Sequence, residues 1–267
     1  KILIRVMTLL DSDLLHGKVF FQGGLRTVRR SKEVVFLSLN DCSCLGSLEV
    51  VVGEDSPAFE VVGQLGTGAC VGVHGEMGAS PGEGQSWEVQ AGEIIVSGET
   101  DDAFPLQKKR HGFDFLRSIA HLRPRTNAYG AVFRTRSRIA HAVHTFFQER
   151  GFHYVQNPIN TSSDCEGAGE LFRVTTLDPK RPPSSDRGDV DFSQDFFGCE
   201  TGLTVSGQLE GELCATAFGD VYTFGPTFSA ENSNTSRHAA EFWRIEPEMA
   251  FCDLAANCDL AEDFLRY

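Results

Sequence analysis

Residues 34–41, which read VVFLSLND, decide the fold of the first part of the chain. Successive side chains of a strand point to opposite faces, so Val35, Leu37 and Leu39 share one face. Phe36 and Ser38 share the other. The pair Asn-Asp at residues 40–41 is typical of a turn. This stretch therefore predicts a strand over residues 34–39 that ends in a turn.

Similar short strands are predicted on both sides of this stretch. They cover residues 19–21, 25–28, 48–52, 71–76, 87–89 and 94–96, with glycines at 23–24 and a hairpin tip at 80–84. A short helix is predicted within residues 57–65. This pattern matches an OB-fold barrel, which has five strands with a short helix between the third and the fourth and commonly binds oligonucleotides. We assign this all-β domain to residues 1–100.

Residues 101–267 mix helices with strands and are predicted to form a second, α+β domain. Val132, Ile139 and Val143 recur at helical spacing, and Gly151 is placed to end a helix over residues 131–150. A strand is predicted over residues 152–159. Residues 180–195 are rich in Pro, Ser and Asp, which predicts a loop.

Charge is distributed unevenly along the chain. It has 24 Lys+Arg against 37 Asp+Glu, a formal charge of −13, yet residues 107–150 hold ten basic and only two acidic side chains. This asymmetry indicates either an anionic partner such as nucleic acid or a solvated helix face, and composition alone favours the second. No apolar run reaches the roughly 20 residues of a membrane helix, so we expect no membrane insertion.

A polar pocket is predicted where two strands of the second domain pair. In a strand over residues 241–250, four side chains line one face: Phe242, Arg244, Glu246 and Glu248. Burying these charges is costly unless something polar occupies the cleft. A partner strand over 221–231 would place Ser229 and Glu231 on the same side. Ser206 and Gln208 also share a face, and Glu212 lies one helical turn after Gln208.

Seven segments, in order, carry a resemblance to a known family. They are residues 25–29 (LRTVR), 36–41 (FLSLND), 105–109 (PLQKK), 121–126 (HLRPRT), 164–170 (DCEGAGE), 205–212 (VSGQLEGE) and a stretch from 224–227 (FGPT) to Met249. They make the chain similar to class II aminoacyl-tRNA synthetases, and most similar to asparaginyl-tRNA synthetases. The resemblance covers nearly the whole chain.

The resemblance implies an OB-fold anticodon-binding domain followed by an antiparallel six-stranded catalytic sheet. It implies ATP and Mg²⁺ as cofactors, tRNA as a partner and a homodimer formed through residues 131–158. It implies ATP contacts by Glu231, His238 and Phe242, amino-acid contacts by Glu166, Ser206, Gln208 and Glu212, and RNA contacts by Arg26, Phe36 and Glu49. An anionic Glu212 accepts hydrogen bonds from a side-chain amide, which favours asparagine over aspartate.

Three departures from the family pattern bear on activity. Ser229 stands where the second motif has an arginine that grips the ATP α-phosphate. The chain stops at Tyr267, before the third motif and its ATP-binding arginine. In the barrel, Glu49 stands where the family has glutamine, and Gly24 replaces a bulky aromatic residue.

These departures lead us to expect a chain that forms no adenylate, has no catalytic residue of its own and needs no cofactor. Its expected role is as a structural or RNA-contacting subunit, with protein partners covering the shortened sheet. The alternative is a working asparagine–tRNA ligase seen as a fragment. A third class is an ATP-dependent enzyme that amidates aspartate. The compartment stays open between cytoplasm, mitochondrion and plastid.

Overall fold

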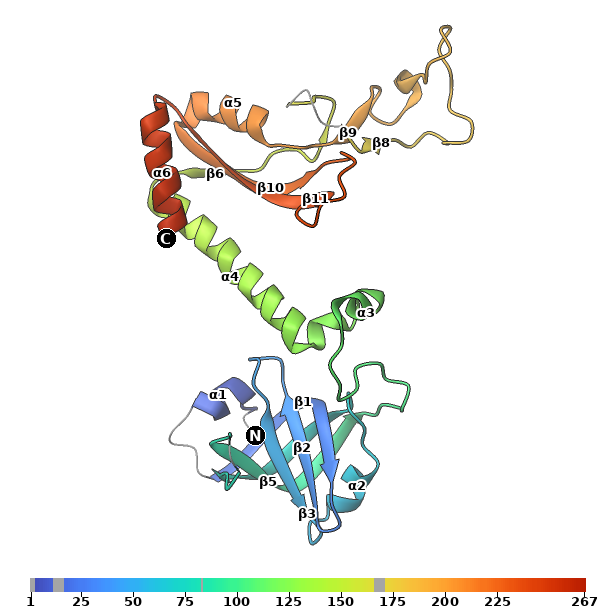
Figure 1. The fold of residues 1–267 in the computed structure, drawn as a ribbon, viewed down its shortest axis with the longest axis vertical. Coiled ribbons are helices and arrows are strands. Elements are labelled where there is room, and N and C mark those ends of the chain that lie inside the picture. Colours follow the sequence, from blue (N-terminus) through green and yellow to red (C-terminus); the bar gives the residue numbers. More distant parts are fainter. Residues whose placement is uncertain (1–2, 12–16, 83, 166–170) are drawn as a thin grey trace. The chain divides into compact units, whose positions relative to one another are not determined.

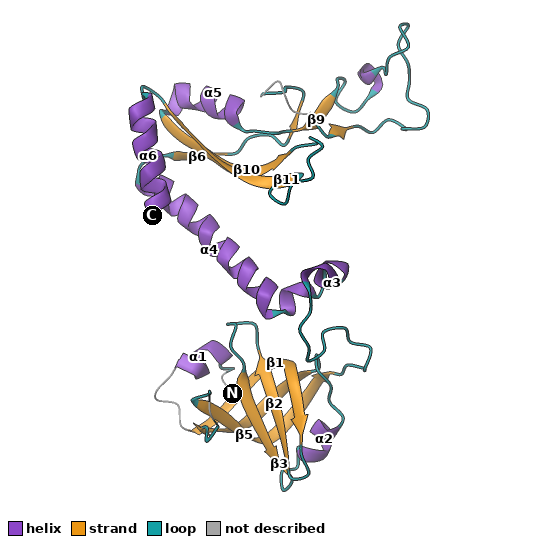
Figure 2. Cartoon of the chain, viewed as in Figure 1, coloured by secondary structure: helices purple, strands orange, loops and turns teal. Residues whose placement is uncertain are grey.

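The structure is a computed structural model that describes residues 3–11, 17–82, 84–165 and 171–267. The chain divides into two compact units, residues 1–137 and 138–267 (Figure 1). This division falls inside helix α4 (Asn127–Glu149), so the predicted domain boundary at residue 100 stays a prediction. Figure 2 separates the elements by type: the first unit is mainly strands, and the second combines strands with helices.

Five strands of the first unit close into a barrel in the order β1-β2-β3-β5-β4, which confirms the predicted OB-fold. The strands are β1 (Gly17–Arg30), β2 (Val34–Asn40), β3 (Leu48–Gly53), β4 (Cys70–Ala79) and β5 (Trp87–Gly98). The short helix α2 (Phe59–Gly63) lies between the third and fourth strands, as predicted. The other helices of this unit are α1 (Val6–Asp11), α3 (Phe113–Ser118) and the 3₁₀ turn η1 (Arg123–Arg125).

The alternation in β2 fills the barrel core. Leu37 and Leu39 are fully buried and Val35 is 2% exposed, whereas Phe36 on the other face is only partly buried. The apolar side of the pattern therefore points inward.

Two predicted breaks in the barrel strands are absent. The glycines at 23–24 do not end a strand, because β1 continues through them. A Cβ on Gly23 would lie 2.6 Å from the carbonyl oxygen of Asn40 on β2, so the missing side chain permits close approach of the two strands. The segments 87–89 and 94–96 likewise belong to the single strand β5.

The second unit has two three-stranded sheets, ordered β11-β10-β6 and β7-β9-β8. Its strands are β6 (His153–Val155), β7 (Asn160–Thr161), β8 (Arg173–Val174), β9 (Thr201–Leu203), β10 (Asp220–Phe228) and β11 (Glu241–Met249). Its helices are α5 (Gln208–Phe218), α6 (Leu254–Arg266) and the 3₁₀ turn η2 (Phe192–Gln194). None of the described helices is long and apolar enough to cross a membrane.

Several expectations for this unit need correction. The predicted helix is real but begins at Asn127. The strand expected over 152–159 is shorter in the structure, where only β6 pairs with β10, through Val155. β6 pairs with β10 in parallel, so the described strands do not form one antiparallel sheet of six.

Aromatic side chains fix β10 against the helices. Phe147 of α4 stacks on Tyr222 of β10 with ring centroids 4.7 Å apart, and Phe146 packs edge-on against Phe264 of α6. The Tyr222 hydroxyl lies 2.7 Å from Nδ1 of His144. Burial raises the pKa of Tyr222. This core holds the strand that carries the candidate site.

Candidate functional site

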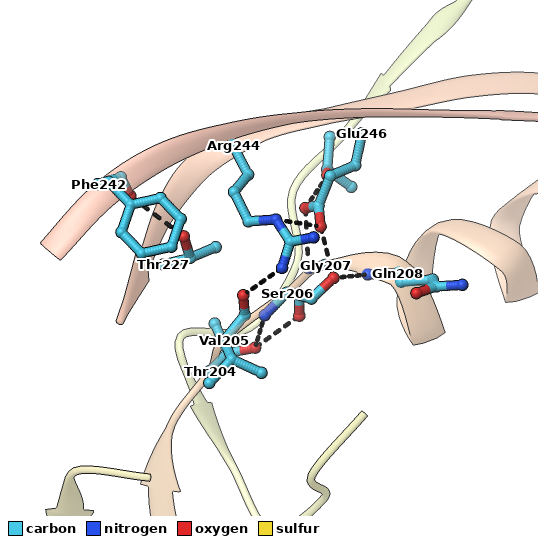
Figure 3. A network of polar contacts seen from close by, with 10 residues as sticks. Thr204, Val205, Ser206, Gly207, Gln208, Thr227, Phe242, Arg244 and Glu246 are labelled. Carbon is cyan, nitrogen blue, oxygen red and sulfur yellow. Dashed lines mark hydrogen bonds and ion pairs between the residues drawn. The ribbon is translucent and has the colours of Figure 1, made fainter. Parts of the chain in front are cut away.

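The β10–β11 hairpin forms the floor of the site (Figure 3). Thr223 lies opposite Glu246, Gly225 opposite Arg244, and Thr227 opposite Phe242. Opposed residues of an antiparallel pair point to the same face, so these side chains project together. The register puts these side chains on one face, as the alternation predicts, and a polar binding pocket on that face stays a prediction.

Glu246 is the anchor of the site. Its carboxylate accepts hydrogen bonds from Ser206 Oγ at 2.5 Å and from the Gly207 backbone amide at 3.0 Å (Figure 3). It also accepts one from Thr223 Oγ1 at 3.0 Å. A Cβ on Gly207 would lie 2.9 Å from Thr223 Oγ1, which is why glycine suits this position. Three donors from two elements therefore hold one carboxylate in place.

Arg244 joins the two sides of the site. Its Nη1 donates to the carbonyl oxygen of Val205 at 2.8 Å, and its Nε lies 3.2 Å from Oε1 of Glu246. The Arg244 side chain keeps 32% exposure, whereas that of Glu246 keeps 12%. Strand alternation predicts that Arg244 lies on this face, but no pattern in the sequence indicates what its side chain contacts there.

The residues expected to surround the amino acid begin helix α5. Gln208 Nε2 donates a hydrogen bond to Glu212 Oε1 at 2.9 Å across the predicted helical turn. The backbone amide of Gln208 donates to Ser206 Oγ at 3.1 Å. Partial burial raises the pKa of Glu248, and the like charges of Glu212 and Glu246 raise it further. Glu166, also expected here, lies outside the described residues.

The residues expected to hold ATP are spread along the hairpin and its loop. Phe242 keeps 37% exposure, and its carbonyl accepts a hydrogen bond from Thr227 Oγ1 at 3.2 Å. Within the described residues, the Nε2 atom of His238 is buried without a hydrogen-bond partner. Glu231 is exposed and lies beyond β10, which ends at Phe228, so the strand predicted over 221–231 is three residues too long.

Ser229 follows β10 on the same face of the hairpin. Its amide donates to the Ala240 carbonyl at 3.0 Å, and its Oγ accepts from the Glu231 amide at 3.4 Å. The position continues the hairpin and carries no charge.

On the barrel, two of the residues expected to contact RNA lie together. Arg29 Nη2 lies 2.6 Å from Glu49 Oε1, and the same guanidinium is 5.2 Å from the centre of the Phe36 ring. Arg29 was not among the expected site residues. It pairs with the charge of Glu49, so that carboxylate does not stand alone beside Phe36.

Arg26 lies elsewhere, in a cavity of about 650 Å³ within the first unit. Lys109, Arg110 and Arg125 of the basic stretch line the same cavity. Burial lowers the pKa of Arg26, and nearby Arg125 and Arg134 lower it further. Part of the basic stretch at residues 107–150 therefore lines this cavity.

Two family models match the chain. One describes class II tRNA synthetases (D, K and N) and covers residues 114–267. The other describes an OB-fold nucleic acid binding domain and covers residues 19–97. The first model matches more than half of the chain. The chain therefore belongs to the class II tRNA synthetases of the D, K and N group.

Curated relatives are similar over nearly the whole chain. An asparagine–tRNA ligase of Geobacter metallireducens is 60% identical over 264 residues, which are 99% of this chain and 57% of the relative. One of a Nostoc species is 56% identical over 98% of this chain and 57% of the relative. The chain thus spans somewhat over half the length of the curated relatives it matches.

Solved structures show the same fold. The asparaginyl-tRNA synthetase of Pyrococcus horikoshii, complexed with asparaginyl-adenylate, has a TM-score of 0.80 and 24% identity, and the match covers 98% of this chain and 56% of that one. The Entamoeba histolytica asparaginyl-tRNA synthetase has a TM-score of 0.79 and 23% identity, over 98% of this chain and 56% of that one. At these identities the likeness concerns the fold.

Proposed function

We propose that the protein containing this chain is an asparagine–tRNA ligase, which activates asparagine with ATP and transfers it to tRNA. The observation that carries this proposal is the site built around Glu246, Gln208 and Glu212, in a chain 60% identical to an asparagine–tRNA ligase. The idle, structural role expected from the sequence becomes the second candidate.

The side chains at the start of α5 favour asparagine as the amino-acid substrate. Glu212 accepts a hydrogen bond from Gln208, and a carboxylate there can equally accept one from the amide NH₂ of a substrate. An aspartate side chain would bring a further negative charge beside Glu212 and Glu248. The arrangement therefore disfavours aspartate.

The hairpin supports ATP. Phe242 offers a partly exposed ring for adenine to stack on, and the unpartnered Nε2 of His238 offers a polar contact on the loop that joins β10 to β11. Among the described residues no group of three metal-ligating side chains comes together.

The proposed reaction has two steps. A carboxylate oxygen of asparagine attacks the α-phosphorus of ATP and forms a new P–O bond. The bond from the α-phosphorus to its bridging oxygen breaks, and pyrophosphate leaves with that electron pair. A hydroxyl of the tRNA then attacks the carbonyl carbon of the adenylate and forms an ester. The bond from that carbon to the phosphate oxygen breaks, AMP leaves with the electron pair, and the hydroxyl proton is released. The protein's task is to position these groups and to stabilise the charge that develops on the phosphate.

Two partner proposals accompany this function. The cavity around Arg26 and the Phe36 surface of the barrel are candidates for tRNA contact, because cations bind phosphates and exposed aromatic rings stack on bases. A homodimer through residues 131–158 is the other, and half-exposed Val132 and Ile139 of α4 lie within that range.

One observation favours the second candidate, an inactive RNA-contacting protein. Ser229 gives the site a neutral hydroxyl where the family resemblance implies an arginine. A single hydroxyl cannot replace a fork of charged donors on a phosphate.

Asparagine-dependent ATP–pyrophosphate exchange separates the two candidates. The complete protein that contains this chain should exchange label with asparagine and much less with aspartate. Equal exchange with both amino acids would contradict the assignment of Glu212, and absence of exchange with either would favour the inactive candidate.

A further inference from the structure

We propose that Arg244 is the cation of this site that binds phosphate. It would take the role that the family resemblance gives to an arginine at position 229, where this chain has serine. The inference rests on the proposed function, since it concerns the nucleotide of that reaction. It assigns Arg244 to the α-phosphate of ATP and of the adenylate.

The hairpin register places Arg244 within reach of the same ligand. Ser229 comes two residues after Thr227, and Arg244 comes two residues after Phe242. Thr227 and Phe242 are directly opposed, so positions 229 and 244 flank this pair from its two ends on one face of the sheet. Each lies two residues, roughly 7 Å of extended chain, from the pair.

The space beside Phe242 suits the guanidinium. Gly225, directly opposite Arg244, has no side chain to fill the face there. The Arg244 side chain is one-third exposed and projects between the Phe242 ring and the Glu246 carboxylate (Figure 3). A nucleotide whose base stacks on Phe242 would bring its phosphate next to this group.

Glu246 positions Arg244 without depending on it. Ser206, Gly207 and Thr223 donate to the Glu246 carboxylate, so it remains hydrogen-bonded when Arg244 turns toward a ligand. The carboxylate in turn contacts Nε of Arg244. The planar fork is thereby oriented before the nucleotide arrives, which reduces the entropy lost on binding.

The local charge calls for a cation. Glu212 and Glu246 act electrostatically on Glu248, and these negative charges would repel a phosphate. Arg244 is the basic side chain on the described part of this hairpin face, and a guanidinium binds phosphate through two parallel hydrogen bonds. It bears a permanent charge and neither gains nor loses a proton during the reaction.

The test compares Arg244→Met with Arg244→Lys and with the double variant Ser229→Arg/Arg244→Met in the complete protein that contains this chain. We expect Arg244→Met to lower kcat/KM for ATP in pyrophosphate exchange by roughly 10²- to 10³-fold. The lysine variant should retain part of the activity, and an arginine at position 229 should restore much of it.

Binding of AMP and of adenosine provides a readout that a merely structural role would not give. Arg244→Met should weaken AMP binding at least tenfold and leave adenosine binding unchanged, because the two probes differ only in the phosphate. Arg266→Met is the matched control: Arg266 also pairs with a glutamate, Glu262, but on the exposed helix α6.

The outcomes separate this inference from the proposed function. Equal loss of AMP and adenosine binding, or an unchanged KM for ATP, would overturn the role of Arg244. Arg237 lies in the loop between β10 and β11. Loss of AMP binding in Arg237→Met but not in Arg244→Met would assign the phosphate to this loop instead. If the wild-type protein shows no ATP–pyrophosphate exchange, only the proposed ligase function is contradicted. The comparison of AMP binding with adenosine binding still decides the role of Arg244.

Discussion

Replacing Glu246 by glutamine tests whether this carboxylate holds the hairpin to the start of α5. Hydrogen bonds to a charged group stabilise a fold by about 1.5–3 kcal/mol each, and Glu246 accepts three of them besides its ion pair with Arg244. Glutamine keeps one acceptor oxygen but turns an NH₂ group toward the other donors. We therefore expect the free energy of unfolding to fall by about 3 kcal/mol.

Urea unfolding of this chain measures that loss. With Trp87 of the barrel changed to phenylalanine, fluorescence reports on Trp243, which lies on the same strand as Glu246, three residues before it. For an m-value of about 2 kcal/mol/M, the midpoint should fall by roughly 1.5 M. Glu241→Gln is the matched control, since Glu241 is exposed on the opposite face of β11 and its loss should matter little. A Glu246→Gln midpoint within about 0.3 M of the wild-type value would refute the anchoring role.

Three further changes have expected outcomes. Glu248→Gln should stabilise the chain at pH 7, because the raised pKa means that the fold favours the neutral carboxyl; the gain should shrink as the pH falls and vanish below about pH 4, and a pH series of thermal unfolding checks this. Phe21→Ala should destabilise the barrel by about 3–5 kcal/mol in denaturant unfolding, since Phe21 is fully buried. Phe36→Ala should weaken tRNA binding by about 1–3 kcal/mol in filter binding, and an unchanged affinity would remove Phe36 from the interface.

The barrel could be predicted because its strands obey a local rule. The alternation that places Leu37 and Leu39 on one face of β2 is a property of neighbouring residues, and burial follows it. The glycines at 23–24 misled the prediction because glycine marks both turns and close strand contacts, and only the position of Asn40 on another strand distinguishes them.

The sequence predicts which residues of the site share a face, but not the hydrogen bonds and ion pairs that they form. Alternation placed Phe242, Arg244 and Glu246 on one face, and helical spacing joined Gln208 to Glu212. The contact of Glu246 with Ser206 and Gly207 spans about forty residues of chain, and the cross-strand neighbourhood of Arg29, Phe36 and Glu49 involves three strands. Such pairings depend on strand register, which sequence spacing does not specify.

The close approach at Gly23 has a practical consequence for spectroscopy. A probe attached through cysteine at this position would force β1 away from Asn40 and report on a damaged barrel. Gly53, at the end of β3, has no atom within 4 Å of the place a Cβ would take, so a fluorophore or spin label there should report binding events without disturbing the host.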